Sequence, residues 1–254
     1  MPLARADLES LLRARKLDRT LTTAVPVPSA STDAAADEYA VARTGVTGLD
    51  ARLEGGFPRG QLSEIVGPRS SGRASLLLQV CAAATSRAEL VALIDVLDML
   101  DVASAEAAGI DLGRVCWVRG HVVPNPGLCR DLNQRALDQA IKALTLALQS
   151  GIFGVVVFDA GEAPPDALGR LPFTTWLRLQ RIIEGSQTAC VLVGPAPIAR
   201  SSAGLTLQLG ARDARWGSHL FEGLNLEARV VRARWSGGSS RALEHVCVPL
   251  STAC

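Results

Sequence analysis

Gly67-Pro-Arg-Ser-Ser-Gly-Arg-Ala-Ser75 is the stretch of sequence that decides the fold. The apolar run Gln61–Val66 precedes it, and the apolar helical pattern Leu76–Ala84 follows it. A phosphate-binding loop of the type G-x-x-x-x-G-K-[ST] requires this order of strand, glycine-rich turn and helix. The sequence therefore predicts a strand–loop–helix unit of the phosphate-binding kind at residues 61–84.

This loop keeps its glycines but has lost the side chains that act on a nucleotide. Arg73 replaces the lysine that reaches the β- and γ-phosphates, and Ala74 replaces the hydroxyl that ligates Mg²⁺. The backbone N–H groups of the loop can still form an anion-binding nest. We expect a retained structural turn and no cofactor, with weak binding of a nucleotide or phosphate as the alternative. The residues of this vestigial loop site are Gly67, Ser70, Ser71, Gly72 and Arg73, together with Asp159 from a later strand.

Short apolar runs alternate with helical patterns from about residue 42 onward. The predicted strands are Leu62–Val66, Leu90–Asp95, Arg114–Val118, Gly154–Asp159 and Ala189–Val193, and the predicted helices lie near 73–86, 101–108, 131–149 and 173–185. Strands are also predicted at Leu205–Leu209, Leu224–Trp235 and Arg241–Pro249, the last two joined by a turn at 236–240. Continuous apolar strands separated by helices indicate a mostly parallel sheet covered on both faces. We predict an α/β fold with a mostly parallel central sheet flanked by helices and antiparallel C-terminal edge strands.

The first part of the chain differs in composition from the rest. Residues 1–23 have a helical pattern that contains Leu8, Leu11 and Leu12, and residues 24–41 are rich in Pro, Ser, Ala and Asp, as linkers are. We predict an N-terminal helical arm, a flexible linker and a core at residues 42–254. The arm either docks on a partner, which we favour, or packs on its own domain.

Composition narrows the classes of function. The net charge of +1 argues against a globally basic nucleic-acid binder but not against a local basic patch. Six cysteines without a C-x-x-C pair and three isolated histidines indicate neither a disulfide framework nor a zinc site. Because no apolar run approaches the roughly 20 residues of a membrane span, we expect a soluble, cytoplasmic protein without a membrane partner.

Three further segments carry a family resemblance. Thr44–Asp50, Gly55–Gly60 and Glu64–Gly72 resemble the opening of a RecA-family recombinase core, and the similarity extends over roughly residues 42–195 through Val155–Asp159. The resemblance implies a RecA-like core.

The same resemblance implies two more catalytic groups that this sequence lacks. Leu97 stands where the family has the glutamate that orients the attacking water, and Gly194-Pro195 stands where an Asn-Gln pair senses the γ-phosphate. Asp159 is kept. We expect the altered residues to lie in one pocket and ATP turnover to be lost.

The resemblance also implies two DNA-binding loops, at Ala160–Arg170 and Ala196–Ala203. Both are short and poor in basic residues, so we do not expect filament-style DNA binding. A separate arginine-rich patch combines a predicted loop, Arg212–His219, with the strand after it. Exposed strand arginines, a partner surface and a nucleic-acid surface are the three competing interpretations. The candidate residues are Arg212, Arg215, Trp216, Arg229, Arg232 and Arg234.

A RecA-like chain with an altered ATP site, short DNA loops and an N-terminal arm resembles the ImuA family, accessory proteins of the bacterial damage-induced mutagenesis cassette. The resemblance implies a non-catalytic adaptor in error-prone translesion synthesis. Its implied partner is an ImuB-like, polymerase-related protein, with RecA, DNA and a second copy as further candidates. The alternatives are an active RecA/RadA-like DNA-dependent ATPase with an atypical site and a SulA-type cell-division inhibitor.

Overall fold

The computed structural model describes residues 41–121, 129–216, 221–233 and 246–251, with backbone alone for residues 201, 211–216, 221–226 and 246–251. All of these belong to one unit, residues 35–254. The predicted arm with Leu8, Leu11 and Leu12, nearly all of the linker, Arg234 and the turn at 236–240 lie outside the described residues.

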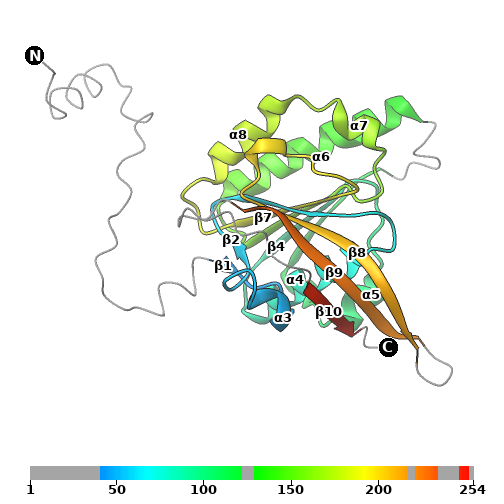
Figure 1. Ribbon diagram of the computed structural model, residues 1–254. Coiled ribbons are helices and arrows are strands. Elements are labelled where there is room, and N and C mark those ends of the chain that lie inside the picture. Colours follow the sequence, from blue (N-terminus) through cyan, green and yellow to red (C-terminus); the bar gives the residue numbers. More distant parts are fainter. Residues whose placement is uncertain (1–40, 122–128, 217–220, 234–245, 252–254) are drawn as a thin grey trace, which may run out of the picture. The chain divides into compact units, whose positions relative to one another are not determined.

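An eight-stranded sheet forms the centre of this unit, in the order β10-β9-β8-β3-β7-β6-β4-β5 (Figure 1). Strands β3, β7, β6, β4 and β5 run parallel, β8 joins β3 in parallel, and β8, β9 and β10 pair antiparallel. This arrangement confirms the predicted α/β fold with antiparallel edge strands. The strands are β3 (Leu62–Val66), β4 (Val91–Asp95), β5 (Val115–Arg119), β6 (Val155–Asp159), β7 (Ala189–Gly194), β8 (Leu205–Trp216), β9 (Phe221–Ala233) and β10 (Val246–Ser251).

Helices cover both faces of the sheet, with α6, α7 and α8 on one face and α4 on the other (Figure 1). A short antiparallel pair, β1 (Val41–Ala42) with β2 (Phe57–Pro58), precedes β3. No helix of the described part is long and apolar enough to cross a membrane. The helices are α3 (Thr47–Asp50), α4 (Arg73–Ser86), α5 (Val102–Ala107), α6 (Arg130–Ser150), α7 (Pro165–Gly169) and α8 (Phe173–Ile183), with 3₁₀ turns η2 (Leu112–Arg114) and η3 (Arg200–Ser202).

The strand β6 shows why the sheet is buried on both sides. Val155 and Val157 point into the apolar cluster under α4, whereas Val156 and Phe158 point into the cluster under α6 and α8. The ring of Trp176, on α8, meets Phe158 edge-on at 6.2 Å between centroids. Because both faces of such a strand are apolar, its sequence shows no alternation.

Two predicted loops contain regular structure. Strand β8 continues through residues 212–216, which we predicted as part of a loop, and pairs with β9 through register shifts at Ala211/Asp213 and Arg215/Trp216. A bulge breaks the alternation on which strand prediction depends, which explains the error. The predicted loop at 160–170 contains α7, whose first residue, Pro165, has the backbone angle that begins a helix.

Candidate functional site

The loop between β3 and α4 has a shape that only glycine permits at two points. Gly72 has φ of +85° and caps α4, a left-handed conformation that favours glycine. A Cβ on Gly67 would lie 2.4 Å from the backbone oxygen of Leu209, on the neighbouring strand β8. The two glycines of the motif therefore fix the geometry of the loop.

Ser71 contributes a buried hydroxyl to this loop. Its side chain is 1% exposed, and its Oγ has no hydrogen-bond partner among the described residues. Ser70 is exposed and has φ of +58°. A buried hydroxyl without a partner is costly, and an anion at the loop would supply an acceptor.

Arg73 is the first residue of α4, and its guanidinium turns into the protein. The residue is 6% exposed; Nη1 donates to the backbone oxygen of Gly161 at 3.0 Å, and Nη2 lies 3.5 Å from Glu162 Oε1. Burial lowers the pKa of Arg73, and the carboxylates of Glu162 and Asp159 oppose that effect. A cation is therefore held in the interior, between the loop after β3 and the segment after β6.

A second arginine reinforces this contact. Arg69, which is largely exposed, lies with Nη2 at 2.5 Å from Glu162 Oε2. Glu162 thus receives one arginine from the tip of the loop and one from the start of α4. Together these contacts join the loop after β3 to the segment after β6.

Asp159 ends β6 at the same edge of the sheet, because β3 and β6 point in the same direction. Burial raises the pKa of Asp159 to about 6. The Gly161 N–H, which donates to Oδ1 at 2.9 Å, and the charge of Arg73 oppose the rise, whereas Asp95 and Glu162 add to it. This carboxyl group is therefore mostly ionised at pH 7 and takes up a proton as the pH falls through about 6.

A hollow of about 230 Å³ connects these groups. Leu97, 5% exposed, lines it beside the two aspartates, so the structure brings this predicted substitution into the site. Among the described residues, no three His, Cys, Asp or Glu side chains could share a metal ion. The lining residues are Arg73, Ala74, Asp95, Leu97, Met99, Asp159, Gly161, Glu162 and Val193.

Pro195 is not brought into that hollow, contrary to the expectation of one shared pocket. It lines a separate hollow of about 100 Å³ together with Leu168 and Ile198. The chain turns directly after β7, and Ile198 packs so closely on Gly194 that an added Cβ would lie 2.9 Å from its Cδ1. This turn directs Pro195 toward α7.

Two buried carboxylates near the site were not found from the sequence. Asp95, at the end of β4, accepts hydrogen bonds from the N–H groups of Met99 (2.9 Å) and Leu100 (2.8 Å) and from Trp117 Nε1 (3.3 Å). It holds the turn after β4.

Glu64, in β3, is fully buried. It accepts bonds from the N–H groups of Ile198 (2.6 Å) and Ala199 (2.7 Å) and from Thr206 Oγ1 (2.8 Å). It fixes the segment after β7. A carboxylate inside a strand predicted to be buried was the only signal available for Glu64. No motif marks Glu162 as the partner of the loop arginines.

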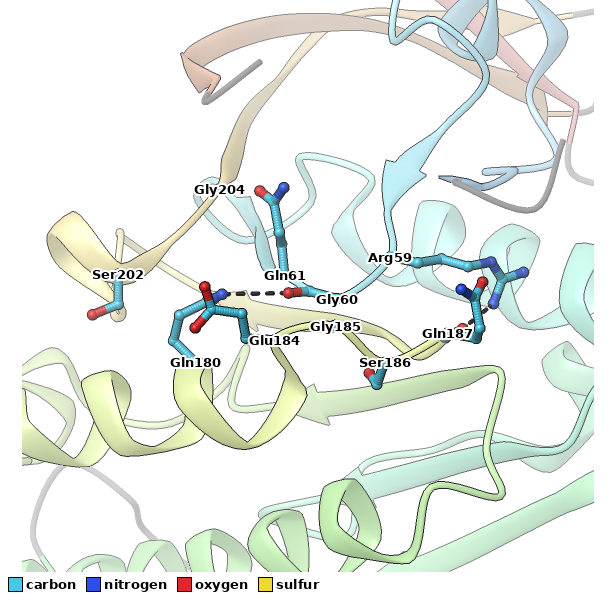
Figure 2. A pocket seen from close by; sticks show the side chains of 10 residues that line it. All are labelled: Arg59, Gly60, Gln61, Gln180, Glu184, Gly185, Ser186, Gln187, Ser202 and Gly204. Carbon is cyan, nitrogen blue, oxygen red and sulfur yellow. Dashed lines mark hydrogen bonds between the residues drawn. The ribbon is translucent and has the colours of Figure 1, made fainter. Parts of the chain in front are cut away.

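A larger hollow, of about 520 Å³, lies at the opposite edge of the sheet, where β3 and β7 begin (Figure 2). Gln180, from α8, donates to the Gly60 oxygen at 3.3 Å and accepts from the Leu62 N–H at 3.0 Å. Arg59 donates to the oxygens of Gly154, at 3.0 Å, and Gln187, at 2.7 Å. Since these polar side chains already bond to neighbouring backbone, they join the segments that meet here.

The structure separates the predicted arginine-rich patch into two places on the β8–β9 hairpin. Arg229 lies opposite Gln208, whereas Arg215 lies opposite Gly223. Residues 208 and 215 are seven positions apart, which is about 23 Å at 3.3 Å per residue. Arg212 and Trp216 belong to the distal place. Arg229 and Arg232 are exposed at the proximal place, where Arg232 donates to the backbone oxygen of Arg200.

Comparison with known proteins agrees with this geometry. Residues 30–162, just over half of the chain, match the RecA N-terminal domain family. Protein RecA of Rubrobacter xylanophilus is 35% identical over 132 residues, which are 52% of this chain and 34% of that protein. Protein RecA of Nitratiruptor sp. is 36% identical over 121 residues, 47% of this chain and 31% of that protein. Protein RecA of Chlorobium chlorochromatii is 29% identical over 165 residues, 59% of this chain and 43% of that protein. The chain thus spans about a third of the length of the first two relatives. It belongs to the RecA family, through the N-terminal domain of that family.

Proposed function

We propose that this RecA-family chain is a cytoplasmic, non-catalytic adaptor of the bacterial DNA-damage response that supports error-prone translesion synthesis. The proposal that the chain is non-catalytic rests on the position and contacts of the Arg73 guanidinium. It stands at the motif's lysine position and binds the protein's own Gly161 and Glu162. The adaptor part rests on the resemblance of the sequence to the ImuA family.

The residues present do not fit a metal-bound nucleotide of the RecA kind. Ala74 offers no oxygen to Mg²⁺, and Leu97 offers no carboxylate to a water molecule. The positive charge of Arg73 already lies beside Asp159, the remaining candidate ligand. Two unit charges 4 Å apart repel by about 4 kcal/mol at an effective dielectric constant of 20. A divalent cation would meet about twice that repulsion, so we assign no step of hydrolysis to this site.

Hydrolysis is tested directly with the purified chain, with and without single-stranded DNA. We expect no release of phosphate above the buffer blank and no difference between the wild type and Asp159→Ala. Turnover that depends on DNA and is abolished in Asp159→Ala would refute the non-catalytic proposal. It would establish the alternative of an atypical RecA-like ATPase, which family membership supports equally.

The partners are tested by titration with an ImuB-like protein, RecA, single-stranded DNA and the cell-division protein FtsZ. We expect the ImuB-like protein to bind, with RecA, DNA and self-association as further contacts of the adaptor. Binding to FtsZ alone would favour the SulA-type alternative.

The predicted arm and the proximal arginines are compared by two variants, deletion of residues 1–41 and Arg229→Ala/Arg232→Ala. Unchanged affinity of both variants for every partner would exclude these surfaces. Arg43→Ala, in the core just beyond the deletion, is a control for the removal of one basic side chain.

A further inference from the structure

Three charged contacts join two segments that are far apart in the sequence. Arg73 bonds to the Gly161 oxygen and lies near Glu162, and Arg69 pairs with Glu162. The loop at 67–73 is thereby held against the segment at 159–162, close to the central carboxylate Asp159.

We propose that the Arg73 guanidinium is a built-in cation. It takes the place of the divalent metal ion of a bound nucleotide as the countercharge of Asp159 and Glu162, and it holds the loop against the 159–162 segment. This role goes beyond a missing ATPase activity. An ATPase activity is lost as soon as its catalytic groups are absent. A built-in cation makes a further demand, because the arginine at position 73 must also stabilise the fold.

The geometry suits a guanidinium better than an ammonium. Nη1 and Nη2 of Arg73 reach Gly161 and Glu162 respectively, a fork that a single ammonium cannot reproduce. Gly161 has no side chain, and an added Cβ would lie 3.4 Å from Nη1 and 3.6 Å from Cζ. The guanidinium therefore lies directly against the glycine backbone.

The charges around the hollow explain why a cation is needed. Asp95 is satisfied by two N–H groups and an indole. Asp159 accepts a hydrogen bond from the Gly161 N–H, and burial raises its pKa. Without Arg73, Asp159 would keep its acidic neighbours and lose its nearest cation. Cations from solution would then gather at this uncompensated negative charge, although the described carboxylates form no preformed metal site.

Arg73→Met tests this role, because methionine keeps much of the apolar stem and removes the charge. We expect its melting temperature to fall by about 5 °C, as for the loss of a buried charged hydrogen bond. We also expect millimolar MgCl₂ to restore about 3 °C relative to NaCl of equal ionic strength. The wild type should show no such magnesium-specific rise.

Three further variants make the result specific. Arg114→Met removes an exposed arginine that pairs with Asp111, so it should change the melting temperature by less than about 2 °C and confer no magnesium response. Arg73→Met/Asp159→Asn should lose the magnesium response of the single variant. Arg73→Lys keeps the charge without the fork, so it should melt below the wild type and not respond to magnesium. It also serves if Arg73→Met does not fold.

A magnesium response absent from Arg73→Met, or equal in the wild type, would overturn the proposed replacement of a cation. Wild-type stability of Arg73→Lys would overturn the proposed role of the fork. These readouts do not involve ATP. Hydrolysis by the wild type would refute the proposed function and leave the melting results to decide on Arg73.

Discussion

Replacing Asp159 with asparagine should make the protein more stable at alkaline pH. The carboxyl group ends β6 in a buried place, and burial raises its pKa to about 6 from the usual 3.8. Asparagine has nearly the same shape, and its Oδ1 can still accept the bond that Gly161 N–H donates at 2.9 Å. The substitution therefore removes the charge and keeps the local geometry.

The size and sign of the effect follow from proton linkage. Because the folded protein holds this proton more tightly than the unfolded chain, the raised pKa contributes stability below about pH 4. That contribution is lost as the pH rises through about 6. The pKa difference corresponds to about 3 kcal/mol in the free energy of unfolding, at about 1.4 kcal/mol per pH unit. The attraction of Arg73 is already contained in this pKa, because it opposes the rise. We expect Asp159→Asn to gain about 2–3 kcal/mol over the wild type at about pH 8.

Urea unfolding of both proteins at about pH 4.5, 6 and 8 measures this difference. Asp98→Asn is a control of opposite sign, because the hydrogen bond from Arg119 lowers the pKa of Asp98. Asp98 stabilises the fold above its unfolded pKa, and that contribution is lost as the pH falls through its lowered folded pKa. A free-energy difference between wild type and Asp159→Asn that stays constant from pH 4.5 to 8 would refute the reasoning from burial.

Substitutions at three further positions test the packing around the site. Glu64→Ala should lower the free energy of unfolding, measured in urea, by at least about 3 kcal/mol, because it leaves two buried N–H groups and the Thr206 hydroxyl without an acceptor. Glu64→Gln can still accept a hydrogen bond, so its loss should be smaller. Equal losses in the two variants would argue against the missing acceptor as the cause. Gly67→Ala should lower the free energy of unfolding by about 2 kcal/mol or more, since its Cβ would lie 2.4 Å from the backbone oxygen of Leu209. Wild-type stability of this variant would show that β8 can move away at little cost. Trp176→Ala removes the ring packed on Phe158 and should lose about 3–5 kcal/mol, with a loss under about 1 kcal/mol contradicting its place in the core.

The central strands and helices could be predicted because each of their sequence segments shows one pattern, either a continuous apolar run or a helical spacing of apolar residues. β3 and α4 have the predicted bounds, 62–66 and 73–86, since an apolar run, a glycine loop and a helical pattern follow each other without overlap. The strands β4, β5, β6 and β7 begin or end one residue from their predicted bounds. Strands buried on both faces give this signal wherever they occur.

The site was less predictable because its contacts join distant parts of the chain. Arg73 was identified as a changed residue, but its partners lie 88 and 89 positions away, at Gly161 and Glu162. The direction of Pro195 depends on one turn, and the extension of β8 depends on bulges. Cys116 lies in an apolar strand pattern but is exposed, because β5 is the edge strand of the described sheet. Tertiary neighbours decide each of these features.

The buried carboxylate of Glu64 has a consequence for how the segment after β7 would bind another molecule. Its bonds to Ile198, Ala199 and Thr206 hold the segment after β7 in one shape before any encounter. A partner that recognises this segment would not have to order it, so little conformational entropy would be lost there on association. We expect recognition at this place to resemble rigid-body docking, in which shape selects the partner and the free and bound backbones coincide.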